Sequence, residues 1–134
     1  GAILELGGQV PNMRGAFYPI TLLSDVRPGM AAFDEEIFGP VFTLIFAEDE
    51  AHAINLANQT PFGLGAAIFT EDIKKGEDIA KNKLNAGSCF VNDFVKSDPR
   101  LPFGGVKESG YGRELSSYGL MEFVNIKTVV VNDV

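Results

Sequence analysis

Three residue types are scarce in this sequence, which has one cysteine, one histidine and no tryptophan. A single cysteine, Cys89, cannot form an internal disulfide, and an unpaired thiol suits a reducing compartment, so we expect a cytoplasmic protein. Cys89 and His52 lie far apart in the sequence and give no zinc or haem spacing, which predicts no metal site. A hydrolytic triad needs a histidine base, but no Gly-x-Ser-x-Gly turn occurs and His52 falls on a predicted helix, where we expect it at the surface.

Basic residues are also in the minority. Eleven Lys and Arg stand against 18 Asp and Glu, which gives a formal net charge of −7 at pH 7. Binding to nucleic acid needs clustered cations that neutralise phosphates, so no nucleic-acid partner is expected. No apolar run approaches the roughly 20 residues of a membrane-spanning helix, which predicts no membrane segment. With 46% hydrophobic and 22% charged residues over 134 positions, the composition is that of a globular chain of ordinary domain length.

The order of apolar residues predicts short strands that alternate with helices. Predicted strands cover residues 2–6, 17–23, 41–46, 63–69, 88–92 and 123–131, and predicted helices cover about 48–60, 71–83 and 114–121. Residues 41–46 are apolar on both faces, which favours a fully buried strand of a parallel sheet. Two successive strand–helix–strand passages imply right-handed crossovers. The sequence therefore predicts an α/β fold with a parallel sheet flanked by helices.

Two of these elements carry more specific expectations. For the helix ending near residue 83, Thr70 is the expected N-cap with Asp72 as the alternative, and the residues expected to face inward are Ile73, Ile79 and Ala80. The last strand, 123–131, is rich in β-branched residues, and Lys127 is its one charged residue. With so little charge to protect an exposed edge, it needs a partner strand.

The segment 101–114 is the densest in glycine, with four glycines within nine positions. Glycine permits positive φ and close backbone approach, and the segment also holds Phe103 and Arg113, which a flexible linker would lack. We therefore expect an ordered crossing beside a cleft. The pairs Gly63-x-Gly65 and Gly110-x-Gly112 lack the third glycine of a dinucleotide fingerprint, so no phosphate cradle is predicted.

A turn-rich, acidic stretch at residues 24–36 ends in Glu35 and Glu36, just ahead of Phe38. A carboxylate can accept hydrogen bonds from both hydroxyls of a ribose, and an aromatic ring two residues later can pack on an adjoining flat face. The residues alone favour the alternative, which is a solvated acidic turn. Cys89 lies between apolar neighbours in a predicted strand, where burial raises a thiol pKa and leaves the thiol inert.

Taken together, the sequence resembles the C-terminal part of the aldehyde dehydrogenase superfamily and is most similar to bacterial succinate-semialdehyde dehydrogenases. The motifs that carry the resemblance occur in the same order and spacing across nearly the whole chain. They are Glu35-Glu36-Ile37-Phe38-Gly39-Pro40-Val41, Ala57-Asn58 to Phe62-Gly63-Leu64-Gly65, Ala86-Gly87 to Val91-Asn92, and Pro102-Phe103-Gly104-Gly105-Val106-Lys107-Glu108-Ser109-Gly110-Tyr111-Gly112-Arg113-Glu114.

The resemblance implies an enzyme that oxidises a small aldehyde, with succinate semialdehyde expected, to its acid with NAD or NADP, through a cysteine thiohemiacetal, hydride transfer and thioester hydrolysis. Glu36 matches the acid that holds the nicotinamide ribose, and Phe38 the aromatic residue beside the nicotinamide. Phe103 matches the aromatic wall of the substrate tunnel. Ser97 or Asp98 falls in the loop that receives the far carboxylate of the substrate, and Ser97 is the better donor.

The resemblance also implies what this chain lacks. The nucleophilic cysteine, general-base glutamate, oxyanion asparagine and dinucleotide-binding sheet of the family precede the first motif, and Cys89 matches a core-strand position. We therefore expect no catalytic residue here and no activity from the chain alone, which would be a piece of a longer parent enzyme. Residues 1–122 would be a three-layer portion of the catalytic domain, and residues 123–134 a strand that joins a homo-oligomer. The alternative is a free-standing binding or assembly module with this fold and no catalysis.

Overall fold

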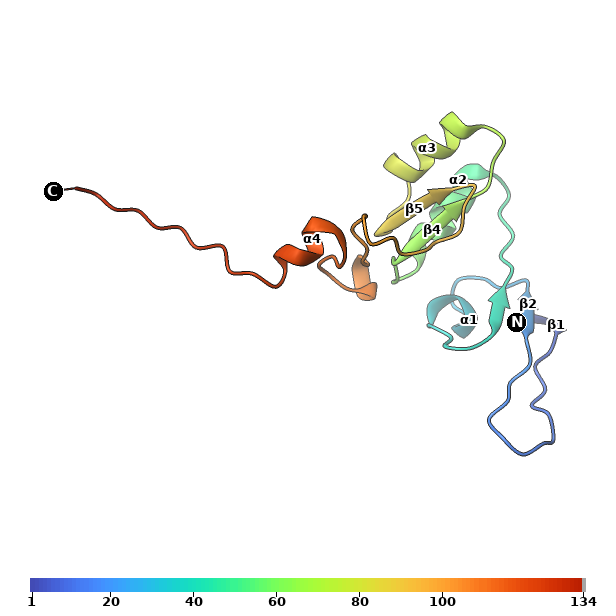
Figure 1. Ribbon diagram of the computed structural model, residues 1–134. Helices are drawn as coiled ribbons and strands as arrows, with labels where there is room; N and C mark the ends of the chain where they lie inside the picture. The colour runs from blue at the N-terminus through green and yellow to red at the C-terminus, as the bar shows by residue number, and fades with distance from the viewer. Residues whose placement is uncertain (134) are drawn as a thin grey trace. The chain divides into compact units, whose positions relative to one another are not determined.

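The computed structural model describes residues 1–133, so the last residue of the predicted tail, Val134, lies outside the described residues. The chain divides into two compact units, Gly1–Thr60 and Pro61–Val134. The first unit contains β1, β2, α1, β3 and α2, and the second contains β4, α3, β5, a 3₁₀ turn and α4 (Figure 1).

The first unit holds a mixed three-stranded sheet. Its strands are β1 (Ile3–Leu6), β2 (Thr21–Ser24) and β3 (Val41–Thr43), in the order β1-β2-β3. β2 runs parallel to β3 but antiparallel to β1, so the prediction of a purely parallel sheet is wrong here. The reason is the connection, because Gly7 and Gly8 have positive φ values of 76° and 77° and no helix follows before β2 to carry the chain across the sheet.

β2 begins later than the predicted strand 17–23 because of Pro19, which has no N–H to donate to a neighbouring strand. The Thr21 hydroxyl donates to the Pro19 carbonyl at 3.1 Å and accepts from the Gly8 N–H at 2.9 Å. Thr21 is 3% exposed, so its hydroxyl needs partners within the protein, and these two hydrogen bonds supply them. This contact fixes the start of β2 at Thr21.

Two helices complete the first unit. α1 (Ala31–Asp34) is a single turn within the stretch predicted to be turn-rich, and it was not predicted as a helix. α2 (Glu50–Gln59) confirms the helix predicted over 48–60. Its N-cap is Asp49, whose carboxylate accepts from the His52 N–H at 2.7 Å, and it ends two residues before Pro61, as the restricted backbone before a proline requires.

The apolar run 41–46 is not a fully buried strand in this chain. β3 covers only its first three residues and lies at the end of the sheet order, with β2 as its one strand neighbour. Phe42, Leu44 and Phe46 are exposed, Phe46 at 80%. The expectation of burial fails because a strand that is apolar on both faces needs a covering layer on each side, and nothing among residues 1–133 covers these side chains.

The second unit is built on one strand–helix–strand passage. β4 (Gly65–Ile68) and β5 (Ser88–Val91) are parallel, and α3 (Ile73–Asn82) connects them and packs against β5 (Figure 1). Gly76 permits this packing, because a Cβ there would lie 2.8 Å from a methyl carbon of Val91. This passage confirms one of the two strand–helix–strand passages predicted from the sequence. The other is not formed, because β3 and β4 belong to different sheets.

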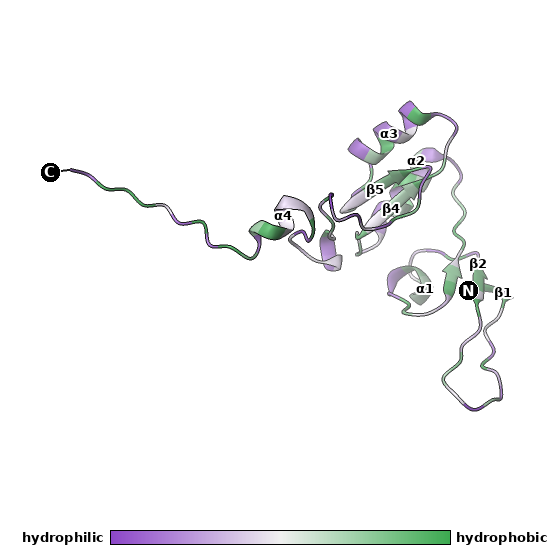
Figure 2. Ribbon diagram, viewed as in Figure 1, coloured by the Kyte–Doolittle hydropathy of each residue, from purple (hydrophilic) through white to green (hydrophobic). Residues whose placement is uncertain are grey.

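α3 corrects two details of the prediction. Its N-cap is Asp72, whose carboxylate accepts from the Lys75 N–H at 3.0 Å, whereas the Thr70 hydroxyl accepts only from the Asp72 N–H. Ile79 is buried as expected, but Ile73 is exposed because it occupies the first helical position beside the cap. Hydrophilic and hydrophobic residues alternate along α3 in Figure 2, as in an amphipathic helix.

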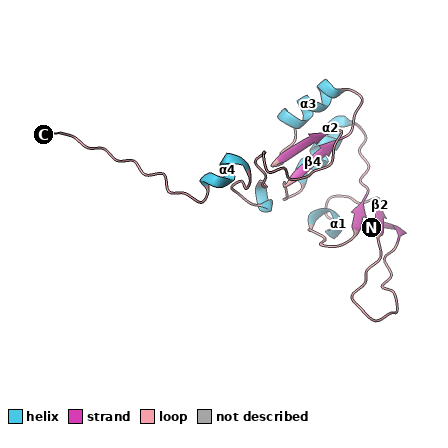
Figure 3. Ribbon diagram, in the orientation of Figure 1, coloured by secondary structure: helices cyan, strands magenta, loops and turns pink. Residues whose placement is uncertain are grey.

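After the glycine-rich segment the chain forms α4 (Ser116–Met121), which confirms the helix predicted near 114–121. Among residues 122–133 no strand is present, and Figure 3 draws this tail as loop. The predicted strand 123–131 is therefore not formed, because a strand requires a neighbouring edge and the described chain supplies none to the tail. The architecture is a small α/β fold with one mixed sheet and one parallel pair.

Candidate functional site

The glycine-rich segment of the second unit is anchored on Gly63, the residue two positions before β4. The Gly63 carbonyl accepts from the N–H groups of Gly87 at 2.9 Å and Val106 at 3.0 Å. The Gly63 N–H donates to the Ser109 hydroxyl at 2.9 Å. One residue thus joins the entry to β4, the entry to β5 and both ends of the 3₁₀ turn Lys107–Ser109.

The segment has two limbs, residues 101–105 and 110–114, and they pair through Phe103 and Glu114. Phe103 donates to the Glu114 carbonyl at 2.9 Å and accepts from the Glu114 N–H at 2.8 Å, a two-residue antiparallel bridge. Nη1 of Arg113 donates to the carbonyls of Gly105 at 2.9 Å and Gly112 at 2.6 Å. The segment is an ordered crossing, as its composition predicted.

Glycine is required where the limbs meet the rest of the unit. A Cβ on Gly87 would lie 1.7 Å from the Gly104 carbonyl oxygen, and one on Gly105 would lie 2.5 Å from Cβ of Ser109. Neither distance is compatible with a side chain. The predicted close approach is therefore between parts of this unit.

A hollow of about 370 Å³ lies beside this crossing. Phe103, which is half-buried, and Leu64 contribute apolar side chains to its lining, and Arg113, Glu114 and Glu122 contribute charged ones. Phe103 and the glycines around it therefore border an open hollow.

The loop 93–100, which contains Ser97, leaves β5 at Asn92. The Asn92 side chain accepts from the Thr70 N–H and donates to the Thr70 carbonyl, each at 2.8 Å, while its own backbone has a positive φ of 54°. This pair of hydrogen bonds to the Thr70 backbone fixes the direction in which the loop leaves β5. Ser97 itself is exposed.

Both cations of this loop have a carboxylate within the loop. Lys96 pairs with Asp93 at 2.7 Å, and Arg100 binds Asp98 through Nε at 2.9 Å and Nη2 at 2.6 Å. The hydrogen bonds from Arg100 hold the pKa of Asp98 below its ordinary value, and the same pairing raises the pKa of Arg100. Asp98 therefore serves as the partner of Arg100, which leaves Ser97 as the hydroxyl donor of this loop.

Glu36 and Phe38 belong to the first unit, in the turn that follows α1. Both side chains are exposed, Phe38 at 94%, and the turn is held by a Gly39 N–H to Ile37 carbonyl bond of 2.9 Å. The structure thus places these two residues on one exposed turn of the first unit, and Ser97 and Phe103 in the second unit, where Ser97 is not among the residues that line the hollow beside Phe103.

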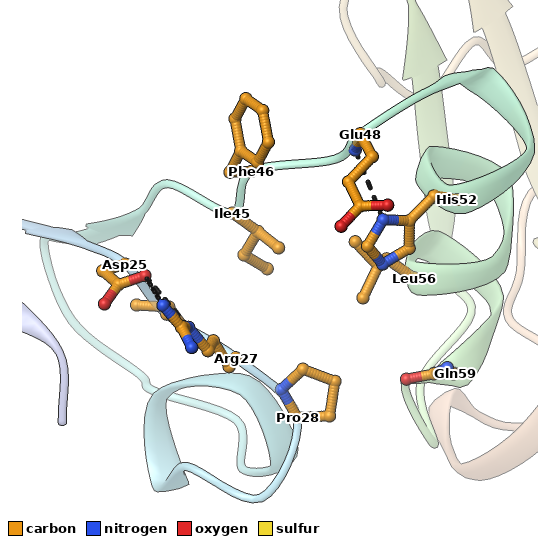
Figure 4. A pocket seen from close by; sticks show the side chains of 10 residues that line it. Asp25, Arg27, Pro28, Ile45, Phe46, Glu48, His52, Leu56 and Gln59 are labelled. Atoms are coloured by element: carbon orange, nitrogen blue, oxygen red, sulfur yellow. Dashed lines mark hydrogen bonds and ion pairs between the residues drawn. The ribbon is translucent and has the colours of Figure 1, made fainter.

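A larger hollow of about 400 Å³ lies within the first unit, and no site residue predicted from the sequence lines it. Figure 4 shows the Asp25–Arg27 ion pair on one side and His52 of α2 on the other, with Ile45 and Phe46 between them. Nδ1 of His52 accepts from the Glu48 N–H at 3.3 Å. Sequence reasoning missed this hollow because its lining comes from three separate segments.

The described residues offer little reactive chemistry. Within residues 1–133 no group of three His, Cys, Asp or Glu side chains is placed to hold a metal ion. Cys89 on β5 is half-buried, and burial raises the pKa of its thiol, which lowers the thiolate fraction at neutral pH. None of the helices described is long and apolar enough to cross a membrane.

Comparison with known sequences gives a consistent set of relatives. The profile of the aldehyde dehydrogenase family matches residues 1–129. The chain is 50% identical over 129 residues to the succinate semialdehyde dehydrogenase [NAD(P)+] Sad of Escherichia coli K12, a match that covers 96% of this chain and 28% of that protein. It is 46% identical over the same length to the succinate-semialdehyde dehydrogenase [NADP(+)] of Mycobacterium leprae, with the same coverage. The chain thus spans 28% of the length of these curated relatives.

Solved structures agree with these matches. A structure of Gox0499, described for its cofactor and substrate selection, aligns with a TM-score of 0.91 and 43% identity over 98% of this chain and 29% of that one. Betaine aldehyde dehydrogenase from Staphylococcus aureus in complex with NAD+ aligns with a TM-score of 0.86 and 40% identity over 92% of this chain and 25% of that one.

Proposed function

Because this chain belongs to the aldehyde dehydrogenase family, we propose that it is part of an NAD(P)-dependent enzyme that oxidises succinate semialdehyde, or a closely related small aldehyde, to its carboxylic acid. The observation that carries this proposal is the 50% identity to the Escherichia coli enzyme over 96% of the chain. The ordered crossing around Phe103 supports it, because a substrate wall must hold its shape.

The proposed contribution of this chain is binding. In the second unit, Phe103 borders the hollow beside the crossing and would form an apolar wall for the aldehyde. The Ser97 hydroxyl, on a loop fixed by Asn92, would donate a hydrogen bond to the distant carboxylate of the substrate.

In the first unit, the exposed turn with Glu36 and Phe38 fits one end of a nicotinamide cofactor. The Glu36 carboxylate would accept hydrogen bonds from the two ribose hydroxyls, and the Phe38 ring would pack beside the adjoining flat ring. Both side chains are open to such a partner. When bound, NAD(P)+ would supply the hydride acceptor. Neither residue distinguishes NAD from NADP.

We further propose that residues 1–122 are a portion of the catalytic domain and that residues 123–134 pair with a neighbouring subunit of a homo-oligomer. The apolar side chains of the tail, among them Ile126, Val129 and Val131, are exposed. An edge strand of another copy would satisfy their backbone groups and cover one face.

The test uses this chain alone and as a replacement for the matching segment of the Escherichia coli relative. With succinate semialdehyde and NAD+ or NADP+, the chain alone should produce no NAD(P)H, and the chimera should do so. Cys89→Ser should leave the turnover of the chimera unchanged, since Cys89 is not the nucleophile. Turnover by the chain alone would contradict the proposal, and a folded but inactive chimera would favour a binding or assembly module.

A further inference from the structure

We propose that Arg113 is a positioning residue that sets the orientation of the Phe103 ring and thereby the affinity of the site for the aldehyde. The inference rests on the proposed function, in which Phe103 is the substrate wall. Arg113 need not contact the substrate. It acts through the backbone of the glycine-rich crossing.

One nitrogen of Arg113 makes two hydrogen bonds to backbone carbonyls. Nη1 of Arg113 donates to the Gly105 carbonyl at 2.9 Å and to the Gly112 carbonyl at 2.6 Å. Gly105 lies two residues after Phe103, and Gly112 lies two residues before Glu114. The guanidinium therefore joins the two limbs of the crossing just inside the bridge that Phe103 and Glu114 make.

The backbones of the two limbs approach each other closely. A Cβ on Gly104 would lie 2.7 Å from the Gly112 carbonyl oxygen and 3.1 Å from Cδ of Arg113. The Phe103–Glu114 bridge closes one end at 2.8 and 2.9 Å. The backbone at Phe103 is consequently held by its own bonds to Glu114 and, two residues later, by the bond from Arg113 to Gly105.

This clamp is connected to the rest of the unit. The Ser109 hydroxyl accepts from Gly63, and the Val106 N–H donates to the same residue, so the far end of the crossing is fixed to the entry of β4. With one end on β4 and the limbs joined by Arg113, the backbone from which the Phe103 ring projects is held in place beside the hollow that the ring borders. Loss of the guanidinium releases the limbs while leaving the Ser109 anchor in place.

The charge of Arg113 matters as well as its reach. Hydrogen bonds from a charged donor are stronger than neutral ones, and the carbonyl of the buried Gly105 is costly to leave unpaired when it loses its donor, whereas the Gly112 carbonyl is exposed to water. A lysine ammonium also has several N–H donors, but it lies on a flexible stem and lacks the planar group that holds the two N–H bonds of Nη1 in fixed directions. Arg113→Lys should therefore restore only part of what Arg113→Met removes.

The experiment is a double-mutant cycle in the chimera, with kcat and KM measured for succinate semialdehyde and for the cofactor. Arg113→Met should raise the KM for the aldehyde about tenfold or more, because small misplacements of a binding group have large effects, and should change the cofactor KM less than about twofold. In a Phe103→Ala background the same substitution should add almost nothing, since the ring it positions is gone. Arg14→Met, at an exposed arginine of the first unit, is the matched control and should have no effect.

Equal losses with and without Phe103 would overturn the inference, as would a rise in the cofactor KM of the same size. An inactive parent chimera would contradict the proposed function instead. In that case amide hydrogen exchange of the 134-residue chain still decides the inference. Arg113→Met should speed exchange at the Phe103 and Glu114 amides about tenfold or more while the Val91 amide on β5 is unchanged, and unchanged exchange at Phe103 would overturn it.

Discussion

The two units of this chain hold their proposed binding residues in different ways. In the first, Glu36 and Phe38 lie on an exposed turn, and Phe38 is 94% exposed. In the second, the backbone of Phe103 is bonded in both directions to Glu114, and the limbs on either side are joined by Arg113. The backbone around Phe103 is thus ordered by several hydrogen bonds within its own unit, whereas the turn of Glu36 and Phe38 has exposed side chains and one backbone hydrogen bond, from Gly39 to Ile37.

The comparison also shows which force orders each unit. Among the described residues the buried hydrophobic side chains are Val26 in the first unit and Ile79 in the second, so neither has a large core of its own. The second unit compensates with polar contacts, such as those of Gly63 with Ser109 and Val106. Hydrogen bonds that join distant parts of a chain can fix a local geometry where apolar burial is small.

The largest expected effect comes from adding a side chain at Gly87, where the glycine-rich crossing lies against the chain. Gly87→Ala places a methyl group 1.7 Å from the Gly104 carbonyl oxygen, so the crossing must move, and we expect the second unit to lose more than about 3 kcal/mol of stability. Gly39→Ala in the first unit is the matched control, since its Cβ would meet nothing within 4 Å, and we expect a change within about 0.5 kcal/mol.

Amide hydrogen exchange resolved by residue measures both effects in the 134-residue chain. Gly87→Ala should remove protection along β4 and β5 and leave the first unit unchanged. If both substitutions reduced protection equally, the crossing would not be the feature that orders the second unit.

Much of this fold could be predicted because its signals are local. The helical period and Pro61 indicated α2, and the small apolar residues of Gly65–Ile68 indicated β4. The antiparallel pairing of β1 with β2 depends on a long connection without a helix, and the burial of 41–46 depends on a covering layer. Neither of these is encoded in a short window of sequence.

The same division applies to the candidate site. The glycine density of residues 101–114 predicted a close, ordered crossing, and the structure confirms it. The clamp made by Arg113 was missed because its partners are the carbonyls of Gly105 and Gly112, and a carbonyl is present at every residue. The placement of Glu36 and Phe38 as cofactor residues stays a prediction.

A smaller effect is expected where the loop 93–100 leaves β5. Asn92→Ala removes two side-chain bonds to the Thr70 backbone and places alanine at a positive φ of 54°, so the second unit should lose about 1–3 kcal/mol. Asn92→Gly separates the causes, because glycine accepts this φ and lacks the side chain. Exchange rates of the Thr70 and Asn92 amides measure the change, and full protection in both variants would contradict the assigned role.

The two helix caps offer a direct comparison of the units. Asp49 caps α2 and Asp72 caps α3, each through one backbone N–H, so substitution by alanine should cost about 1 kcal/mol at either site. α3 packs against β5 through its buried face, whereas no residue of α2 is buried. Asp72→Ala should therefore lower protection across β5, while Asp49→Ala should affect α2 alone. Spreading of the Asp49→Ala effect through β2 and β3 would show that the first unit is as cooperative as the second.

The smallest effect concerns pH and the loop that contains Ser97. Hydrogen bonds from Arg100 lower the pKa of Asp98 in the folded chain, so the ion pair contributes to the order of the loop above the ordinary carboxyl pKa of about 3.9. That contribution is lost as the pH falls through the lowered pKa, because the protonated carboxyl no longer pairs with the guanidinium. A titration of the Asp98 carboxyl carbon by NMR should give a midpoint below the ordinary value, and Arg100→Gln should move it upward.

With the pair broken, by acid or by substitution, the loop should exchange its amides as readily as the exposed turn of Glu36. An Asp98 midpoint that Arg100→Gln leaves in place would show that the pair does not order the loop.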